Sequence, residues 1–370
     1  MNKKEIGLYI HIPFCKHKCD YCDFISFANK EEYIEEYINK LIEEIKIENL
    51  GQYKITTIYI GGGTPSFIHS KYIVQILDSI DKEYAEEITI EVNPGTVTKQ
   101  KLQDYYNAGI NRLSIGLQST SNEMLEQLSR IHTYEEFLET YNLAKQIGFT
   151  NINIDLMIGL PNQKITDIDK SLNEIIRLNA NHVSVYSLIL EEGTVLENKV
   201  NKGILKLPTE ERERKMYWLV KNKLQKAGYK HYEISNFAKT GFESKHNLNC
   251  WEQKEYIGIG LAAHSYLNKT RYSNTEDLNK YLRSVNKNRE IHEVQKQEDE
   301  QKEYMLLGLR KIEGVNIQNF KNKFIQNPIY LYREALDKLV KNKLIEIDTN
   351  YIKLTKKGID LANLVWEEFV

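Results

Sequence analysis

The chain has 370 residues, with 50 Lys and Arg against 52 Asp and Glu and a formal net charge of -2. This length exceeds one average domain and excludes a peptide or an isolated motif. The near-neutral balance gives no strong field to attract nucleic acid or an anionic membrane to the chain as a whole. With 41 % hydrophobic and 28 % charged residues, the composition indicates a soluble globular protein.

Membrane and disulfide patterns are both missing from the sequence. No stretch approaches the roughly 18 consecutive apolar residues of a membrane span, and the N-terminus lacks the apolar segment typical of a secretion signal. Three of the four cysteines lie within eight residues, a poor arrangement for disulfides in a chain of this length. We therefore expect a cytoplasmic protein whose clustered cysteines are ligands.

Six similar units follow one another between residues 7 and 190, each a short β-branched run, a turn and an amphipathic stretch. The clearest helix is expected over residues 31–49, with Asn29 and Glu32 as its capping box. The alternation predicts the α/β class, with a parallel sheet that is either an open doubly wound sheet or a partial (β/α)6 TIM-like barrel. The predicted strands are Leu8–Ile12, Ile55–Ile60, Ile88–Val92, Arg112–Gly116, Asn151–Met157 and His182–Leu188.

The pattern changes after residue 190 to a C-terminal α+β extension. A helix over Thr209–Ala227 and a Gly-rich run over Tyr256–Tyr266 come first. The last part predicts three helices, two short strands (Leu344–Ile347 and Tyr351–Leu354) and a helix over Gly358–Glu368, as in a winged helix. From residue 300 onward, 12 Lys and Arg stand against 10 Asp and Glu, a difference of only +2, so we expect packing or partner docking rather than DNA binding.

These patterns divide the chain into three expected regions. Residues 1–240 form the barrel core, with a cluster loop at residues 13–24. Residues 241–295 link it to a small winged-helix-like domain at residues 296–370.

The three clustered cysteines, Cys15, Cys19 and Cys22, form a CxxxCxxC pattern directly after the first predicted strand. A tight loop there can aim three thiolates at one centre, and soft thiolates are the ligands that an iron–sulfur cluster prefers. Three ligands leave one iron open. Zinc is the alternative, although structural zinc normally has four ligands and Cys250 is distant in sequence.

The CxxxCxxC pattern at this place resembles the radical S-adenosylmethionine (SAM) superfamily. The resemblance implies a 4Fe-4S cluster whose open iron is chelated by the amino and carboxylate groups of SAM. It further implies that reduction through the cluster cleaves the sulfonium and releases a 5′-deoxyadenosyl radical. Fold-level analogy alone does not show that chemistry.

The same resemblance assigns further residues near the strand ends to the cluster and SAM. They comprise aromatic side chains beside the cluster, a glycine-rich turn that lets the backbone approach a ligand, and polar or charged groups for its methionyl, ribose and carboxylate parts. The polar and charged groups, each taken alone, also read as helix caps or surface ion pairs, and the glycine-rich turn also reads as an ordinary tight βα turn. The assigned residues are Tyr9, Tyr21, Gly62, Gly63, Thr64, Glu91, Gln118, Arg130 and Asp155.

The resemblance narrows to the coproporphyrinogen dehydrogenase-like branch and covers nearly the full chain, through segments such as HIPFC, GGGTPS, EVNP, GLQS and LLGLR. Within it the chain is most similar to the heme chaperones, because Phe24 stands where the decarboxylases carry a fourth cysteine. The implied function is binding of heme and its transfer to respiratory or other acceptor proteins, some of them membrane-associated. The alternatives are a coproporphyrinogen III dehydrogenase, which makes vinyls from propionates, and a metal-binding regulator.

A second motif of these chaperones, HNxxYW, is matched at residues 246–251 except that Cys250 replaces the tyrosine. A neutral imidazole is a common axial ligand of heme iron, a thiolate is another, and a tryptophan can stack on the macrocycle. We therefore expect His246 or Cys250 to ligate heme and Trp251 to contact it. The alternative for His246 is a hydrogen-bonded surface histidine. No catalytic residue is assigned, no nucleic acid is expected as a partner, and a homodimer remains open.

Overall fold

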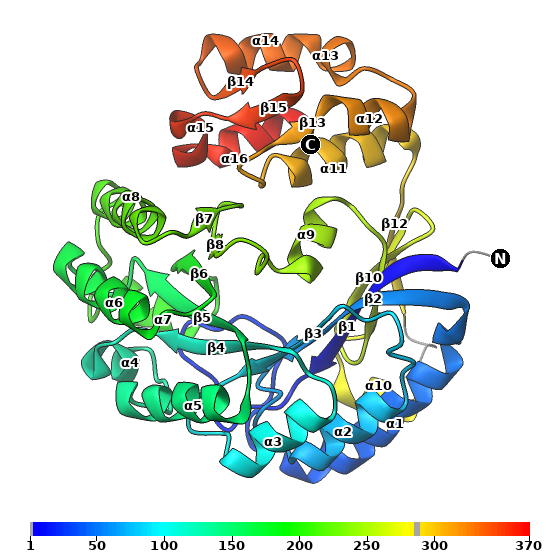
Figure 1. The fold of residues 1–370 in the computed structure, drawn as a ribbon, viewed down its shortest axis with the longest axis vertical. Helices are drawn as coiled ribbons and strands as arrows, with labels where there is room; N and C mark the ends of the chain where they lie inside the picture. Colours follow the sequence, from blue (N-terminus) through cyan, green and yellow to red (C-terminus); the bar gives the residue numbers. More distant parts are fainter. Residues whose placement is uncertain (1–2, 285–288) are drawn as a thin grey trace.

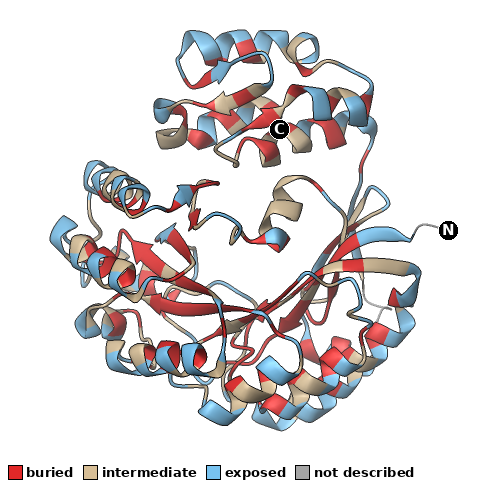
Figure 2. Ribbon diagram, in the orientation of Figure 1, coloured by how far each residue is buried: buried red, intermediate tan, exposed pale blue. Residues whose placement is uncertain are grey.

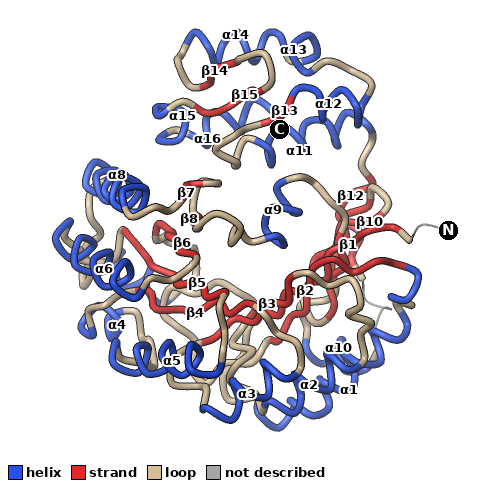
Figure 3. Tube along the Cα trace, viewed as in Figure 1, coloured by secondary structure: helices blue, strands red, loops and turns tan. Residues whose placement is uncertain are grey.

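The computed structural model describes residues 3–284 and 289–370; residues 285–288, within the expected linking region, lie outside that description. Its main feature is a strongly curved sheet of 12 strands in the described residues, in the order β12-β11-β10-β9-β1-β2-β3-β4-β5-β6-β8-β7. Helices cover its convex side, and the curve is open on the other side (Figures 1 and 3).

The six predicted strands form the centre of this sheet, and neighbouring strands are parallel. Since the two ends of the described sheet do not pair with each other, the α/β class and the partial barrel are confirmed. The strands are β1 (Lys4–Ile12), β2 (Tyr53–Gly62), β3 (Glu87–Val92), β4 (Arg112–Gln118), β5 (Asn151–Ile158) and β6 (His182–Ser187).

The convex face of the sheet carries the main hydrophobic core. Isoleucines and leucines at every second strand position, such as Ile58, Ile90 and Leu113, are fully buried against the helices (Figure 2), as the two-residue period of a strand requires. The covering helices are α1 (Ile34–Ile47), α2 (Ser70–Asp78), α3 (Lys99–Asn107), α4 (Asn122–Gln127), α5 (Tyr134–Ile147) and α6 (Ile165–Leu178).

The start of the first helix differs from the prediction. A 3-10 turn, Glu31–Tyr33, precedes α1, and its N-cap residue is Lys30, without a capping side chain. Asn29 has a φ of 57°, the left-handed conformation that asparagine tolerates better than most residues. The predicted capping box is therefore wrong, because the chain uses Asn29 to turn into the helix.

The concave face of the sheet is polar, unlike the branched apolar interior of most TIM barrels. Its buried side chains, each at most 3 % exposed, include Thr57, Glu87, Arg112, Asn153 and His182. Buried polar groups of this kind persist where they bind each other or a ligand. The inside of the partial barrel is thus built as a polar chamber.

The next part of the chain extends the sheet at both ends. Strand β8 pairs antiparallel with β6, β9 pairs parallel with β1, and β10 to β12 continue as antiparallel strands. Helix α9 lies on the open, concave side (Figure 1). The elements are α7 (Val195–Asn201), α8 (Glu210–Lys226), β7 (Lys230–His231), β8 (Asn236–Ala238), α9 (Lys245–Trp251), β9 (Tyr256–Ile259), β10 (His264–Leu267), β11 (Thr270–Ser273), α10 (Leu278–Arg283) and β12 (Glu290–Val294).

The C-terminal part has its own core and a three-stranded sheet in the order β13-β15-β14. Its element order is that of a winged helix, although the predicted last helix is split at Leu361, whose φ of -128° is not helical. The elements are α11 (Gln297–Gly308), β13 (Val315–Asn316), α12 (Ile317–Phe324), α13 (Pro328–Leu331), α14 (Arg333–Lys341), β14 (Ile345–Ile347), β15 (Tyr351–Leu354), α15 (Lys356–Asp360) and α16 (Ala362–Trp366).

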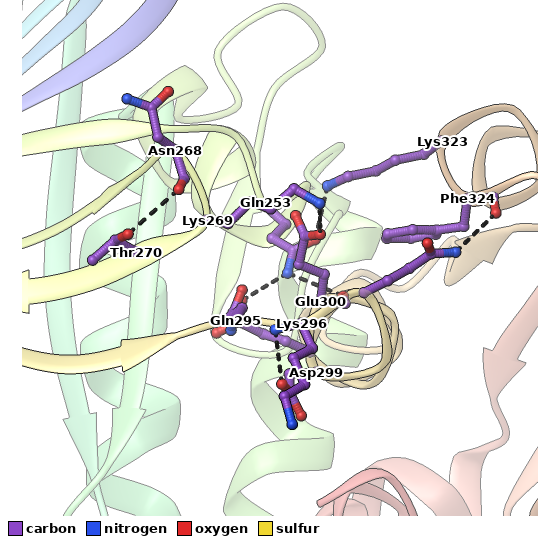
Figure 4. A network of polar contacts seen from close by, with 12 residues as sticks. Gln253, Asn268, Lys269, Thr270, Gln295, Lys296, Asp299, Glu300, Lys323 and Phe324 are labelled. Atoms are coloured by element: carbon purple, nitrogen blue, oxygen red, sulfur yellow. Dashed lines mark hydrogen bonds and ion pairs between the residues drawn. The ribbon is translucent and has the colours of Figure 1, made fainter.

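A polar network joins this C-terminal part to the barrel (Figure 4). The amide of Gln253, just after α9, donates to the Glu300 carbonyl over 3.1 Å and accepts from Lys323 Nζ over 2.8 Å. Lys269, between β10 and β11, forms an ion pair with the Glu300 carboxylate at 2.7 Å. These contacts hold α11 and α12 against α9 and the end of the sheet.

None of the described helices is both long and apolar enough to span a bilayer.

Candidate functional site

The cysteine loop leaves the carboxyl end of β1 and is anchored on both sides. The Cys15 N–H donates to the Phe27 carbonyl over 2.9 Å, and the Asp20 N–H donates to the Leu128 carbonyl over 3.2 Å. The Asp20 carboxylate also accepts from Lys199 Nζ on α7 at 2.5 Å. The loop is therefore held at the mouth of the barrel, where parallel strands end.

The three thiols face one another closely enough to interact electrostatically. Burial and, to a smaller extent, the neighbouring Cys19 raise the pKa of Cys15 and bring the pKa of Cys22 to about 11. Thr64 Oγ1 donates to Cys15 Sγ over 3.4 Å, and Arg130 Nη1 donates to Cys19 Sγ over 3.5 Å. Both donors stabilise thiolates, the form that ligates iron.

This donor set fits a 4Fe-4S cluster. It offers three soft sulfurs and two hydrogen bonds to sulfur, which are the features that bind and tune such clusters. In residues 3–284 and 289–370, no three His, Cys, Asp or Glu side chains are arranged to hold a single metal ion. A cluster of several irons spaces its sulfur ligands more widely than a single ion does.

The glycine-rich turn after β2 packs directly against the cysteine loop. The Gly63 N–H donates to the Ile12 carbonyl, and the Thr64 N–H donates to the Phe14 carbonyl, both over 2.9 Å. A Cβ atom on Gly63 would lie 3.0 Å from Cys15 Sγ. This position therefore needs glycine, because backbone and sulfur already touch there.

Glu91 at the end of β3 is held by two donors. Its Oε1 accepts from the Tyr59 hydroxyl over 2.9 Å, and its Oε2 accepts from the Gly62 N–H over 3.2 Å. Burial raises the pKa of Glu91 to about 7, and the nearby Asp155 carboxylate raises it too. A carboxyl group that ionises near neutrality beside the cysteine loop can bind a cationic or hydroxyl-bearing ligand.

Gln118 and Arg130 meet at the end of β4. The pairing of β4 with β5 shifts between Gly116 and Gln118, and Gln118 has a φ of 65°, so the bulge redirects its side chain. A Cβ on Gly116 would lie 2.9 Å from Gln118 Nε2 and 3.2 Å from Arg130 Nη2. The small residue lets both side chains cross the strand.

The Arg130 guanidinium is largely used by the protein itself. Nη2 donates to Asn93 Oδ1 over 2.7 Å and to the Gly116 carbonyl over 3.2 Å, and Nη1 also reaches the Tyr21 hydroxyl at 3.5 Å. Only Nε is buried without a partner among the described atoms. Arg130 therefore supports Cys19 and Tyr21 in addition to any ligand it contacts.

Asp155 on β5 belongs to the polar chamber. Its carboxylate accepts from Asn153 Nδ2 over 2.7 Å and from the Ser114 hydroxyl over 3.2 Å, and burial raises its pKa despite these bonds. Asn153 continues to His182, whose Nδ1 lies 2.6 Å from Asn153 Oδ1. Asp155 thus ends a buried network.

Tyr9 connects β1 to the same chamber. Its hydroxyl lies 3.0 Å from His11 Nδ1, and His11 Nε2 lies 2.9 Å from the Ile25 carbonyl. The Tyr9 ring stacks on Tyr59 at 6.3 Å. His11 therefore fixes the hydroxyl of Tyr9.

Several residues of the site escape sequence reasoning. Tyr59 lies within the β-branched strand β2 and so looks like an ordinary core residue. Arg112 is the first residue of β4, where a charged side chain looks like an exposed strand end. Asn93 carries a clear signal, because it stands in the same EVNP segment as Glu91. Arg112 is 2 % exposed and its Nε has no partner among the described atoms, but its positive charge lowers the pKa of both Glu91 and Asp155.

His246 lies inside the barrel rather than on its surface. It is 7 % exposed, its Nδ1 lies 3.0 Å from Thr57 Oγ1, and its backbone N–H donates to Glu87 Oε1 over 3.0 Å. Burial and, to a smaller extent, the positive charge of Arg112 lower its pKa to about 4. The imidazole is therefore neutral at physiological pH, the form that ligates iron.

The other two residues of this motif point elsewhere. Burial raises the pKa of Cys250 to about 11, against the opposing effect of Arg271. The ring of Trp251 is covered by the Arg310 guanidinium of the C-terminal domain, 4.3 Å from the ring centroid. The three expected heme residues share one short helix but have three different sets of neighbours.

Comparison with known sequences and structures shows the family and the fold. The family described as the radical SAM superfamily matches residues 9–175, and the HemN C-terminal domain family matches residues 295–361. The solved structure of coproporphyrinogen III oxidase (HemN) from Escherichia coli has a TM-score of 0.85 and 22 % identity, covering 99 % of this chain and 90 % of that one. At this identity the likeness concerns the fold.

Curated relatives match over their full length. The heme chaperone HemW of Lactococcus lactis subsp. lactis (strain IL1403) is 39 % identical, with 100 % of this chain and 98 % of that protein covered. HemW of Bacillus subtilis (strain 168) is 38 % identical, with 98 % of both covered. The chain therefore belongs to the radical SAM superfamily and, within it, to the HemW heme chaperone family.

Proposed function

We propose that this protein is a heme chaperone, which binds heme and passes it to heme-accepting proteins such as those of respiratory chains. The observation that carries the proposal is the full-length similarity, at 38–39 % identity, to proteins named heme chaperone HemW. Phe24, 63 % exposed at the end of the cysteine loop, supports it, because the decarboxylases of the resembled branch carry a cysteine there.

The radical SAM family implies a 4Fe-4S cluster and SAM. The cluster would be held by Cys15, Cys19 and Cys22, with Arg130 and Thr64 donating hydrogen bonds to two of the sulfurs. When bound, the pair supplies one-electron reduction and a SAM-derived radical.

SAM would be held at the barrel mouth by the other residues assigned from the sequence. The ionised Glu91 carboxylate suits an ammonium or ribose hydroxyls, and the Gly62–Gly63 backbone leaves room for close approach. Asp155 would accept from a ribose hydroxyl. Tyr9 and Tyr21, both with pKa values raised by burial, stay protonated and act as hydrogen-bond donors.

Heme would be bound through the motif on α9. His246 supplies a neutral imidazole, Cys250 a second candidate ligand and Trp251 a flat apolar face. Since His246 is buried against Thr57 and Trp251 is covered by Arg310, heme binding requires α9 or the C-terminal domain to shift. The cytoplasmic location expected from the sequence, a homodimer and transfer of heme to respiratory proteins stay predictions.

One preparation tests the function. The protein is reconstituted with iron and sulfide without oxygen, its iron and sulfide content is measured, and hemin is titrated in while the Soret band is recorded. Coproporphyrinogen III is then supplied under reducing conditions with SAM. Stoichiometric heme uptake without vinyl product supports the chaperone; vinyl product without heme uptake would make the protein a coproporphyrinogen III dehydrogenase.

The heme ligand is tested separately. We expect His246→Ala or Cys250→Tyr to shift the Soret maximum or weaken hemin affinity, because each removes one candidate iron ligand. An unchanged spectrum and affinity in both variants would exclude α9 as the heme site while leaving the chaperone function in place.

A further inference from the structure

A continuous row of side chains joins α9 to the barrel mouth along β2. The His246 ring lies 5.2 Å from the Tyr59 ring, at an interplanar angle of 31°. Its Nδ1 is fixed by Thr57, two residues earlier on the same strand. The imidazole and the phenol ring thus pack on each other. Helix α9, which carries His246, lies on the concave side of the sheet (Figure 1).

The other end of Tyr59 reaches the ligand site. Its hydroxyl donates to Glu91 Oε1 over 2.9 Å, and Tyr59 is the only side chain that hydrogen-bonds Glu91 within the described part of the chain. The remaining donor is the Gly62 N–H. A Cβ on Gly61 would lie 3.0 Å from the Tyr59 ring and 3.1 Å from the Glu91 carboxyl, so phenol, turn and carboxylate are packed without space between them.

Because of this packing, Glu91 cannot keep its direction while His246 moves to bind heme. The Glu91 carboxylate keeps its direction only while Tyr59 keeps its place. The His246 side chain is 7 % exposed and packs on the Tyr59 ring, so heme iron can reach its Nε2 only after the imidazole leaves its place beside Tyr59. That movement removes an aromatic neighbour of Tyr59, which then keeps the Tyr9 ring at a centroid distance of 6.3 Å.

We propose that Tyr59 is a positioning residue that aims the Glu91 carboxylate at the SAM site and couples it to His246, so that SAM and heme bind antagonistically. The inference rests on the proposed function, its heme half on the chaperone activity and its SAM half on the proposed SAM site. SAM favours the state with His246 seated on Tyr59, and heme favours the state with His246 displaced. By linkage, each ligand weakens the other by the same factor.

The pKa of Glu91, seen in the pH dependence of SAM binding, should change when the Tyr59 hydroxyl is removed. A purely structural role of Tyr59 would leave this pKa unchanged. The hydrogen bond from Tyr59 lowers the pKa of Glu91, which burial brings to about 7. Two other charged groups face this carboxyl, namely Asp155 on β5, which raises the pKa, and Arg112 on β4, which lowers it. Tyr9 on β1 and Tyr186 on β6 also face it and stay neutral.

The first experiment measures SAM affinity of the reconstituted, heme-free protein by calorimetry between pH 6 and 8.5. Tyr59→Phe should weaken SAM binding about 3- to 10-fold, the usual effect of one hydrogen bond, and move the pH midpoint of binding upward. Tyr105→Phe is the matched control, since the buried Tyr105 hydroxyl on α3 has no partner among the described atoms. Equal affinity and an unmoved midpoint in Tyr59→Phe would overturn the positioning role.

A double-mutant cycle tests the coupling to α9. His246→Gln should weaken SAM binding about threefold, and its effect should largely disappear in the Tyr59→Phe background, because both changes act on one element. Effects that multiply independently would overturn the coupling. Neither result depends on heme.

The second experiment titrates hemin with and without saturating SAM. We expect about a fivefold or larger loss of hemin affinity with SAM, in the range usual for linked sites, and no such loss in Tyr59→Phe. Equal hemin affinity in both conditions would overturn the antagonism and leave the chaperone function standing. An absence of hemin binding in both conditions would instead contradict the proposed function and the antagonism, while the SAM measurements still decide the role of Tyr59.

Discussion

The barrel mouth and helix α9 carry the two sets of functional residues, and they are built differently. At the mouth, the residues come from five strands and the loops after them, yet they contact one another, as Thr64 does with Cys15 and Arg130 with Cys19. On α9, His246 and Trp251 are five residues apart in sequence but face opposite partners, Thr57 and Arg310. The residues of the barrel mouth, which come from distant segments, thus already contact one another. The residues of the short α9 motif are instead covered by other parts of the protein.

The difference follows from the sheet. Carboxyl ends of parallel strands converge at one edge, so any residue placed there joins the same site. A helix of seven residues spreads its side chains around its axis, and its neighbours then decide which of them remain accessible. We therefore expect the mouth to bind its cofactor without rearrangement and α9 to require movement.

Removal of one cluster ligand should give the largest effect at the mouth. Cys19→Ala removes one of three thiols and the acceptor of the Arg130 hydrogen bond, so iron and sulfide per chain after reconstitution should fall close to zero. His17→Ala is the matched control, because His17 is exposed in the same loop. Retention of a full cluster in Cys19→Ala, or its loss in His17→Ala, would contradict the assignment of the ligands.

Acid should weaken the packing of α9 in the barrel. The buried His246 has a folded pKa of about 4, below its ordinary 6.5, so the unfolded chain binds the proton more readily. Its contribution to stability is complete above pH 6.5 and is lost as the pH falls towards 4, on the order of 3 kcal/mol in all. Denaturant unfolding of the heme-free protein should show a shallower loss over this range for His246→Gln, and identical slopes would count against a buried neutral imidazole.

A rise in pH through neutrality should lower the stability of the barrel mouth. Burial raises the folded pKa of Glu91 from 4.5 to about 7, so the protonated carboxyl favours the folded state. This stability is complete below pH 4.5 and is lost as the pH rises through 7, on the order of 2 kcal/mol because the group is partly exposed. In Glu91→Gln, the ligand-free protein should lose less stability between pH 5 and 8 than the wild type does. An equal loss would place the carboxylate in water.

A smaller effect tests the contact between the turn and the loop. Gly63→Ala places a methyl group 3.0 Å from Cys15 Sγ and from two backbone atoms, so overpacking should cost roughly 1–3 kcal/mol and lower cluster occupancy. Gly51→Ala is the control, since a Cβ there meets nothing within 4 Å and should change stability by less than about 0.5 kcal/mol. Thermal unfolding and iron content of both variants decide the matter.

Much of the mouth could be predicted from the sequence because its signals are local. The six strands follow from β-branched runs, and the cluster loop follows from cysteine spacing. What could not be predicted is direction. From the sequence, Arg130 is expected to bind SAM. In the structure its two terminal nitrogens donate to Asn93, Gly116, Cys19 and Tyr21, and the bulge at Gly116 that makes this possible cannot be predicted from local patterns.

On α9 the sequence predicted which residues belong together but not what covers them. His246 is buried because Glu87, at the start of β3, accepts from the backbone at the first turn of α9 and draws the helix into the barrel. That pairing joins segments almost 160 residues apart, and no local pattern announces it. The same holds for Tyr59, whose role exists only because His246 and Glu91 lie on either side of it.

The contact over Trp251 gives the last and smallest prediction. Arg310 lies between two indole rings, 4.3 Å from the Trp251 centroid and 5.2 Å from the Trp366 centroid. Burial raises the pKa of Glu233 to about 7, and the positive charge of Arg310 acts in the opposite direction by lowering that pKa. Arg310→Ala should destabilise the protein by roughly 1–2 kcal/mol, as expected for a desolvated cation between aromatic rings.

The control for this variant is Lys356→Ala, because the Lys356 amine lies 4.6 Å from the Trp218 ring on the surface and should contribute less than about 1 kcal/mol. Thermal unfolding compares the two, and hemin titration adds the functional readout. If Arg310 keeps Trp251 closed, its removal should raise hemin affinity while lowering stability, opposite signs that simple damage to the fold cannot produce. Loss of both together would mean that Trp251 needs the C-terminal domain in place to bind heme.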